Sequence, residues 1–160
     1  MPIVSNATPL IALSRIGRLD ILRGLFQEVI VPGEVYDELV VRGKGRPGSD
    51  VIAAAGWVSR QAVQNSRLVE DLVAQGLGRG EAEAIVLARE AGSTCLTDDL
   101  AAIAAAGRLA VPIRRTLNLL LTAKAKGIVA SLREVMDALR SNNFWIDDAT
   151  YGQVLKLAGE

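Results

Sequence analysis

Short apolar runs alternate with amphipathic segments along the whole chain. The apolar or strictly alternating runs predict short strands at residues 2–5, 28–31, 57–63, 94–97 and 109–113. Pro112 interrupts the last run, and proline within a strand is typical of the edge of a sheet. The pattern therefore predicts four or five strands, each followed by a segment of different periodicity.

The segments between these runs carry apolar residues at helical spacing. They predict helices at residues 8–25, 33–40, 50–55, 67–75, 81–91, 100–106, 116–126, 131–140 and 147–158. Thr8 is expected to cap the first helix, with Pro9 in its first turn. Because short parallel strands are buried on both faces, helices must cover both sides of the sheet. We therefore expect one α/β domain over residues 1–160, with three α/β/α layers around a parallel sheet.

The amino-acid composition excludes several kinds of catalytic site but says less about the fold. Half of the 160 residues are hydrophobic, which suffices for one core, and 18 basic residues balance 18 acidic ones. Zero net charge still allows a local basic patch that binds nucleic acid. The chain has no histidine, which excludes Ser-His-Asp and Cys-His catalysis and zinc sites built from histidine. An enzyme built from these residues would depend on carboxylates, which favour Mg²⁺ or Mn²⁺.

The cysteine content and the apolar runs also predict where the protein acts. Cys95 is the single cysteine, so no internal disulfide can form, and a reducing cytoplasm is expected. No apolar run reaches the length of roughly 20 residues that a membrane span needs. The first residues lack the basic start and apolar run of a signal peptide.

Acidic residues gather around the predicted strand at residues 94–97. Asp98 and Asp99 follow that strand, and Glu81 lies in the first turn of the helix before it. Open α/β sheets place their chemistry at the carboxyl ends of the strands. Helix capping explains one aspartate and the helix dipole explains a first-turn glutamate. Two adjacent aspartates exceed what a cap requires, and a cation would offset their repulsion.

Helical phase distinguishes the two glutamates of the predicted helix 81–91. Glu81 shares a side with Ala84 and Ile85, which is expected to face the sheet. Glu83 lies about 200° further round at ~100° per residue, so we favour Glu81 as a site residue. From the residues alone, Glu38 is expected to be a solvated acid. Asn6, which follows the first strand, suits a turn or cap, and its carbonyl oxygen could also bind a metal.

The basic residues form no nucleotide-binding motif. The loop at residues 42–49 is rich in glycine and cations but lacks the G-x-x-x-x-G-K-[ST] pattern of a P-loop. Arg79 lies between two glycines and could reach a phosphate. Cations that ring the acidic site would bind a phosphate backbone.

Several segments together resemble a known family. The chain contains, in order, VSNATPLIALSRIGRLDIL, VIVPGEVYDEL, LGRGEAEAIVLAREAG, LTDD and VLKLAGE. This set resembles a subgroup of the PIN-domain family that is similar to the VapC-like toxin ribonucleases of bacterial toxin–antitoxin pairs. The resemblance spans essentially the whole chain. It implies a three-layer α/β/α fold and cleavage of single-stranded RNA that depends on Mg²⁺ or Mn²⁺.

The resemblance also assigns roles to individual positions. It places the acidic metal and catalytic positions of the family on Asn6, Glu38, Glu81 and Asp99, with Asp98 as substitute or helper. Thr8 and Thr116 match its small hydroxyl residues, and with Arg79 and Arg115 they form the expected contacts to nucleic acid. The chain departs from the subgroup at Ile103, where an arginine is usual, and at Arg115, where a glycine is usual. Asn6 removes one negative charge, although the subgroup commonly carries asparagine there.

These observations favour a metal-dependent endoribonuclease, with the toxin role, a cognate antitoxin and a homodimer implied by the resemblance. Two alternatives follow from the same residues. Asn6 and Ile103 are consistent with a PIN relative that binds nucleic acid without cutting it. The leucine-rich segment at residues 117–121 and the last predicted helix could instead form a protein–protein surface, although both are more often core.

Overall fold

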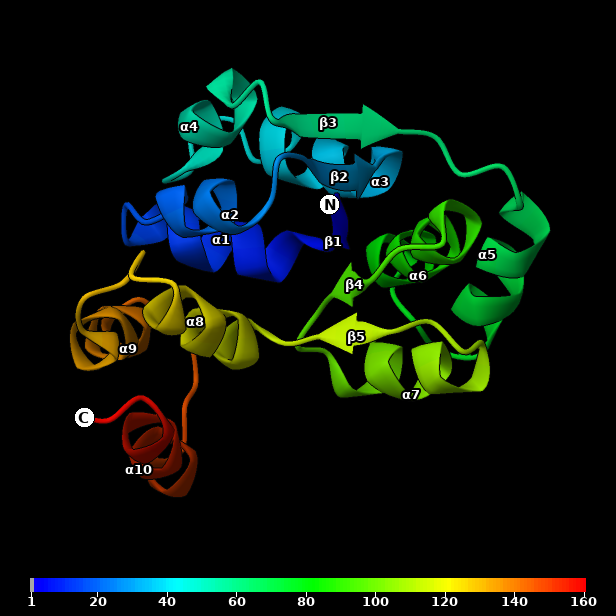
Figure 1. The fold of residues 1–160 in the computed structure, drawn as a ribbon. Helices are drawn as coiled ribbons and strands as arrows, with labels where there is room; N and C mark the ends of the chain where they lie inside the picture. Colours follow the sequence, from blue (N-terminus) through cyan, green and yellow to red (C-terminus); the bar gives the residue numbers. More distant parts are fainter. Residues whose placement is uncertain (1) are drawn as a thin grey trace.

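The computed structural model describes residues 2–160 and is built around a five-stranded parallel sheet. The strands are β1 (Ile3–Ser5), β2 (Val29–Pro32), β3 (Val58–Gln61), β4 (Cys95–Leu96) and β5 (Ile113–Arg114). Their order across the sheet is β3-β2-β1-β4-β5 (Figure 1). Val4 at the centre pairs with Ile30 on one side and with Cys95 on the other. The predicted parallel sheet is confirmed, and β1 is its middle strand.

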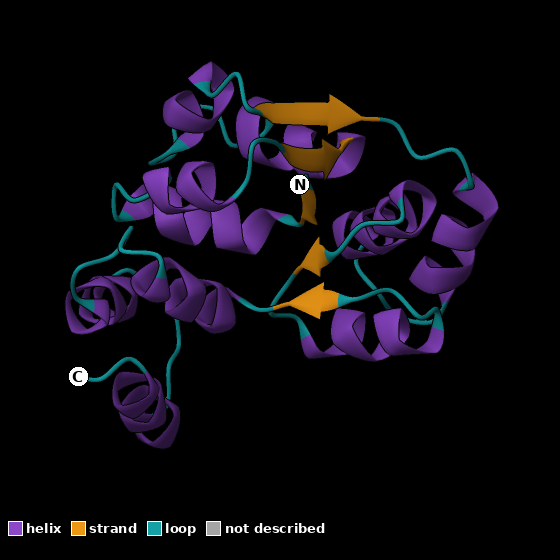
Figure 2. Ribbon diagram, viewed as in Figure 1, coloured by secondary structure: helices purple, strands orange, loops and turns teal. Residues whose placement is uncertain are grey.

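Alternate residues of the strands enter two separate cores. Ile3, Val29 and Leu96 pack into one core, and their neighbours Val4 and Ile30 pack into the other. The first core is covered by α1 (Ala7–Arg15), α2 (Asp20–Leu25), α4 (Ser49–Ala54), α8 (Thr116–Ala125), α9 (Leu132–Ser141) and α10 (Asp148–Leu157). The second is covered by α5 (Ser66–Ala74), α6 (Arg79–Ala91) and α7 (Leu100–Arg108). Helices thus flank both faces of the sheet, which confirms the three-layer α/β/α fold (Figure 2).

Two sequence-based boundaries are wrong for identifiable backbone reasons. The single helix expected at residues 8–25 is two helices, because Gly17 adopts φ 69° and the chain turns between α1 and α2. Thr8 lies inside α1 and is not its cap, since the N-cap position belongs to Asn6. The last strand is Ile113–Arg114 and not residues 109–113, because α7 continues to Arg108 and Ala110 turns the chain with φ 56°.

The segment after β2 is not one regular helix. It begins as α3 (Gly33–Tyr36) and widens into a π-helical turn, η1 (Asp37–Val41). The backbone N–H of Arg42 donates to the carbonyl of Asp37 at 2.7 Å, across five residues. A Cβ at Gly43 would lie 2.5 Å from the carbonyl oxygen of Leu39, so only glycine fits where this turn ends. Such turns often occur at functional sites, and this one carries Glu38.

The helices of the fold are short compared with a membrane span. The longest, α6, has 13 residues, whereas a span needs about 20 apolar residues. Throughout residues 2–160, no helix has both the length and the apolar character to cross a membrane.

Candidate functional site

The candidate site lies at the edge of the sheet where the parallel strands end. Asn6 follows β1, Asp98 and Asp99 follow β4, and the turn that carries Glu38 follows β2. The helix α6 packs against β1, β2 and α3. Its first turn, which carries Glu81, lies at the same edge, because the neighbouring Glu83 accepts a hydrogen bond from the backbone N–H of Glu34 at 3.3 Å. The fold therefore gathers side chains from four separate segments at one edge.

Asn6 occupies the centre of this edge and carries an unusual polar atom. The residue is 3% exposed, and its side-chain amide donates to the hydroxyl of Thr97 at 2.8 Å. That bond turns Oδ1 the other way, and Oδ1 is buried without a hydrogen-bond partner within residues 2–160. A buried unpaired carbonyl oxygen costs about 1–3 kcal/mol and calls for an explanation in a folded protein. A bound cation would supply the missing partner.

Thr97 joins the two halves of the edge, although the sequence analysis did not single it out. Its side chain is 1% exposed. Its hydroxyl oxygen accepts the amide of Asn6 and also the backbone N–H of Asp99 at 3.2 Å. The available signal was a threonine directly before two aspartates at the end of a buried strand. Thr97 thus fixes the orientation of the Asn6 amide relative to the start of α7.

The adjacent aspartates point to different partners. Asp99 caps α7, because one of its carboxylate oxygens accepts the backbone N–H of Ala102 at 2.8 Å, and its side chain remains exposed. Asp98 instead accepts both the backbone N–H of Thr116, at 3.0 Å, and the hydroxyl of Thr116. Thr116 is 1% exposed, and the guanidinium of Arg115 lies 3.7 Å from Asp98.

The contact between Asp98 and Thr116 differs from the roles that the sequence analysis gave them. Asp98 was expected beside the metal and Thr116 beside the nucleic acid, whereas in the structure the two side chains bind each other at the start of α8. Thr8 and Arg115, by contrast, are exposed. The side chain of Arg115 is 49% exposed and lies where β5 gives way to α8.

Glu38 and Glu81 lie close enough for their charges to interact. Partial desolvation and, next, the negative charge of Glu81 raise the pKa of Glu38, while Arg42 opposes the shift. Gly80 adjoins Glu38, and a Cβ there would be in ordinary van der Waals contact with Oε2 of Glu38 at 3.7 Å. A cation beside Glu38 and Glu81 would offset this repulsion.

The raised pKa of Glu38 predicts how stability depends on pH. In the folded protein Glu38 holds its proton more tightly than in the unfolded chain. Its contribution to stability is therefore lost as the pH rises above about 4.5. In EDTA at pH 7, Glu38→Gln should raise Tm by about 1–2 °C, the size expected for an exposed like-charge pair. The difference should vanish at pH 4, and a lower Tm for the variant at pH 7 would contradict the repulsion.

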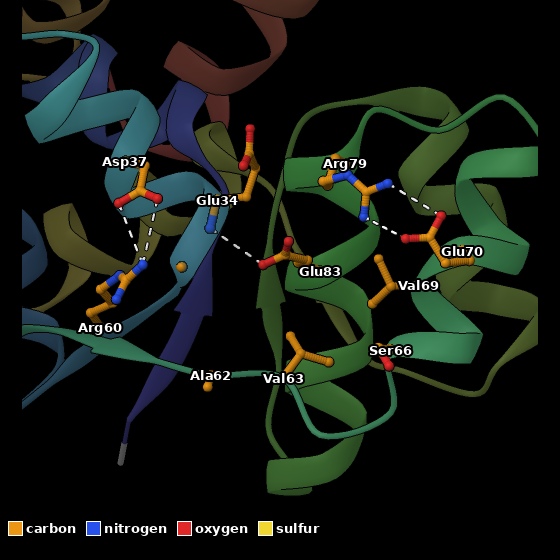
Figure 3. Close-up of a pocket in the computed structure, with 11 residues that line it drawn as sticks. Glu34, Asp37, Arg60, Ala62, Val63, Ser66, Val69, Glu70, Arg79 and Glu83 are labelled. Atoms are coloured by element: carbon orange, nitrogen blue, oxygen red, sulfur yellow. Dashed lines mark hydrogen bonds and ion pairs between the residues drawn. The ribbon is translucent and has the colours of Figure 1, made fainter.

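Arg79 and Glu83 belong to a different cleft. This cleft of about 440 Å³ lies between α3, β3 and the helices α5 and α6. Figure 3 shows Arg79 directed at Glu70 on α5, with an N–O distance of 2.8 Å, and Glu83 directed at the backbone of Glu34. Arg79, which was expected to reach a phosphate, is therefore paired with a carboxylate. The carboxylate of Glu83 holds the start of α3 by accepting the backbone N–H of Glu34.

The donors at the carboxyl edge suit a hard divalent cation. They are the unpaired oxygen of Asn6, the carboxylates of Glu38 and Glu81, and the exposed carboxylate of Asp99. Among residues 2–160, no three side chains of the types His, Cys, Asp and Glu lie together closely enough to hold a metal ion. Mg²⁺, however, keeps several water ligands and is commonly bound by one or two carboxylates. The residues present therefore fit such an ion in their chemistry.

Comparison with known proteins gives one family match. The family model DUF3368, described as a PIN domain, matches residues 2–160. None of the curated proteins matches the chain.

Proposed function

We propose that this chain, which belongs to the PIN-domain family, is a metal-dependent endoribonuclease that cuts single-stranded RNA. PIN domains are generally nucleases that use divalent metal ions, so the family gives a nuclease-type function at a coarse level. One observation carries the finer proposal. The buried oxygen of Asn6, which lacks a partner in the described chain, lies at the end of β1, the strand between β2, which leads to Glu38, and β4, which leads to Asp99.

Each residue at this edge has a role in the proposal. Among Asn6, Glu38, Glu81 and Asp99, one or two carboxylates would hold Mg²⁺ or Mn²⁺ directly, and the other side chains would bind its water ligands. When bound, the ion would polarise the scissile phosphate and help to activate water. Thr97 orients the amide of Asn6 toward the site. The exposed Arg115 and Thr8 are placed to bind the phosphate backbone beside it.

The test is cleavage of an end-labelled single-stranded RNA of mixed sequence, with Mn²⁺ or with EDTA. Asp99→Asn is the control, because asparagine still accepts the hydrogen bond from Ala102 and so preserves the cap of α7. We expect cleavage with Mn²⁺ alone and a loss of at least about 100-fold in the variant. Cleavage in EDTA, or an equal rate for Asp99→Asn, would point to a contaminating nuclease.

A second candidate is a PIN protein that binds RNA without cutting it. Asn6 favours it, because an amide lacks the charge that a carboxylate would give the metal site. Ile103, half-buried on α7, offers no charge either. A shift assay decides between the candidates, since this one predicts retained RNA and no cleavage in Mn²⁺. Loss of both activities would favour a protein–protein module.

The biological role is proposed on the resemblance to VapC-like toxins. In this view the chain is the homodimeric, cytoplasmic toxin of a toxin–antitoxin pair. Induced expression should then arrest growth of its host, and Glu81→Gln should relieve the arrest. A short antitoxin-like reading frame beside the gene should protect the host. Growth that continues during expression of active protein would contradict the toxin role.

A further inference from the structure

We propose that Trp145 forms a stacking platform for an unpaired nucleobase of the RNA strand held at the carboxyl edge of the sheet. This inference rests on the proposed function, because it takes nucleic acid as the ligand. Trp145 lies in the loop between α9 and α10 and is 86% exposed. It lines a groove of about 700 Å³ that also includes Thr8, Asp98 and Arg115. The groove therefore leads from the candidate site to the indole ring.

Apolar exposure on the described surface is concentrated in this groove. Among the exposed large hydrophobic side chains of residues 2–160, Leu100, Trp145 and Leu157 all line it, at 72%, 86% and 68% exposure. Exposed apolar surface gathered in a groove commonly marks a binding site. Trp145 is the aromatic member of the three, and a flat indole face is what an unstacked base prefers.

The loop holds Trp145 in this exposed position. Its neighbours Phe144 and Ile146 both pack into the first core, and Ile146 is only 4% exposed. The guanidinium of Arg140 donates to the carbonyl of Ile146 at 2.7 Å. With the residues on both sides anchored, the indole is presented outward before any ligand arrives. A preorganised aromatic loses little conformational freedom on binding.

The charges along the groove favour one orientation of a bound strand. Arg115 lies at the end near the sheet, where a phosphate would gain a cationic contact. Asp147 lies near the indole, and its carboxylate caps α10 through the backbone N–H of Thr150 at 3.0 Å. A phosphate is unfavourable beside Asp147, whereas a neutral base is not. We therefore place the backbone toward Arg115 and a base on Trp145.

The polar lining of the groove suits base edges. Asn118, Asn143 and Gln153 line it and are exposed. Carboxamides both donate and accept hydrogen bonds, as the edges of unpaired bases require. In a duplex these faces and edges are covered by stacking and pairing. The arrangement therefore selects single-stranded nucleic acid.

Fluorescence of Trp145 tests the proposal without relying on cleavage. The chain has two tryptophans, so Trp57→Phe leaves Trp145 as the single indole. Adding Asp99→Asn prevents cleavage, and the protein is titrated in Mg²⁺ with an unlabelled single-stranded RNA decamer. We expect saturable quenching of the Trp145 emission, at the same Kd that anisotropy of a labelled decamer gives. A duplex of the same sequence should leave the emission unchanged.

Substitutions in the Asp99→Asn chain, which leaves the RNA uncut, provide the second measurement. Trp145→Ala should raise the Kd for the decamer roughly 10-fold, the effect typical of losing one stacked base, and Trp145→Phe should preserve most of the binding. Val51→Ala is the matched control, because it removes an exposed apolar side chain that lies outside the groove. Its Kd should stay within about 2-fold of that of the Asp99→Asn chain.

Each other outcome overturns the inference in a distinguishable way. If RNA is bound and cut while Trp145 emission and the Kd of Trp145→Ala are unchanged, the stacking platform is wrong and the nuclease proposal stands. If no variant binds RNA, both proposals fail. If Trp145→Ala instead converts a dimer to a monomer in size-exclusion chromatography and leaves the Kd unchanged, the groove is a protein interface.

Discussion

Glu81→Gln is expected to slow Mn²⁺-dependent cleavage of single-stranded RNA at least about 100-fold, whereas Glu83→Gln should cut at the wild-type rate. The two glutamates lie two positions apart on α6, yet their carboxylates have different neighbours. Glu81 is close enough to Glu38 to raise its pKa, while Glu83 accepts the backbone N–H of Glu34. Glutamine at position 83 also accepts that hydrogen bond. Only the substitution at Glu81 therefore removes a negative charge from the candidate metal site.

Stability measurements separate loss of function from loss of structure in this pair. In EDTA, Glu81→Gln should melt at or slightly above the wild-type temperature, because it relieves the repulsion with Glu38. A variant that loses cleavage without losing stability identifies a residue that is needed for activity and destabilises the folded state. If Glu81→Gln and Glu83→Gln cleave at the same rate, whether unchanged or reduced, Glu81 has no specific role at the candidate metal site.

Asp98→Ala is expected to lower the free energy of unfolding by about 2–3 kcal/mol, which is roughly 5–10 °C in Tm for a chain of this size. The carboxylate accepts two hydrogen bonds from Thr116, which is 1% exposed. Alanine leaves both donors buried without a partner and releases the start of α8. Helix α8 contributes Leu119 and Leu120 to the first core, so loosening its first turn disturbs packing there.

Urea unfolding followed by circular dichroism measures this loss. Arg115→Ala is the matched control, because it removes only the exposed ion pair to Asp98 at 3.7 Å and should change stability by no more than about 0.5 kcal/mol. The loss of stability for Asp98→Asn should lie between those for Asp98→Ala and Arg115→Ala, since its amide oxygen still accepts one hydrogen bond. A loss for Asp98→Ala as small as that for Arg115→Ala would mean that Asp98 does not hold α8.

Both expectations depend on features that differ in how far the sequence reveals them. The continuous apolar runs of β1 and β2 predicted strands buried on both faces, and Val4 and Ile3 indeed enter opposite cores. Hydrophobic periodicity is a local property, so it can be read from neighbouring residues. It fails where one residue redirects the backbone, as at Gly17 and Ala110, because the turn depends on a dihedral angle and not on polarity.

The candidate site is partly visible in the sequence for the same reason. Helical phase separated Glu81 from Glu83. Asn6 and Asp99 each follow a predicted parallel strand, which implied that both lie at the carboxyl edge of the sheet. Glu38 was a site candidate only through the family resemblance, because no local pattern distinguishes it from the adjacent Asp37. The widened turn that carries it packs against α1 and α4, contacts that no local pattern reveals.

By itself the sequence determined the alternating α/β architecture, the family and the acids available for chemistry. The tertiary structure alone decided which groups each side chain contacts. Asp98 binds Thr116, whereas Asp99 caps α7. Thr97 orients Asn6, and Trp145 stays exposed at the end of a groove. The physical reason is the range of the interactions. Burial follows local composition, whereas a hydrogen bond such as that from Asn6 to Thr97 joins groups far apart in the chain, which only folding brings within reach.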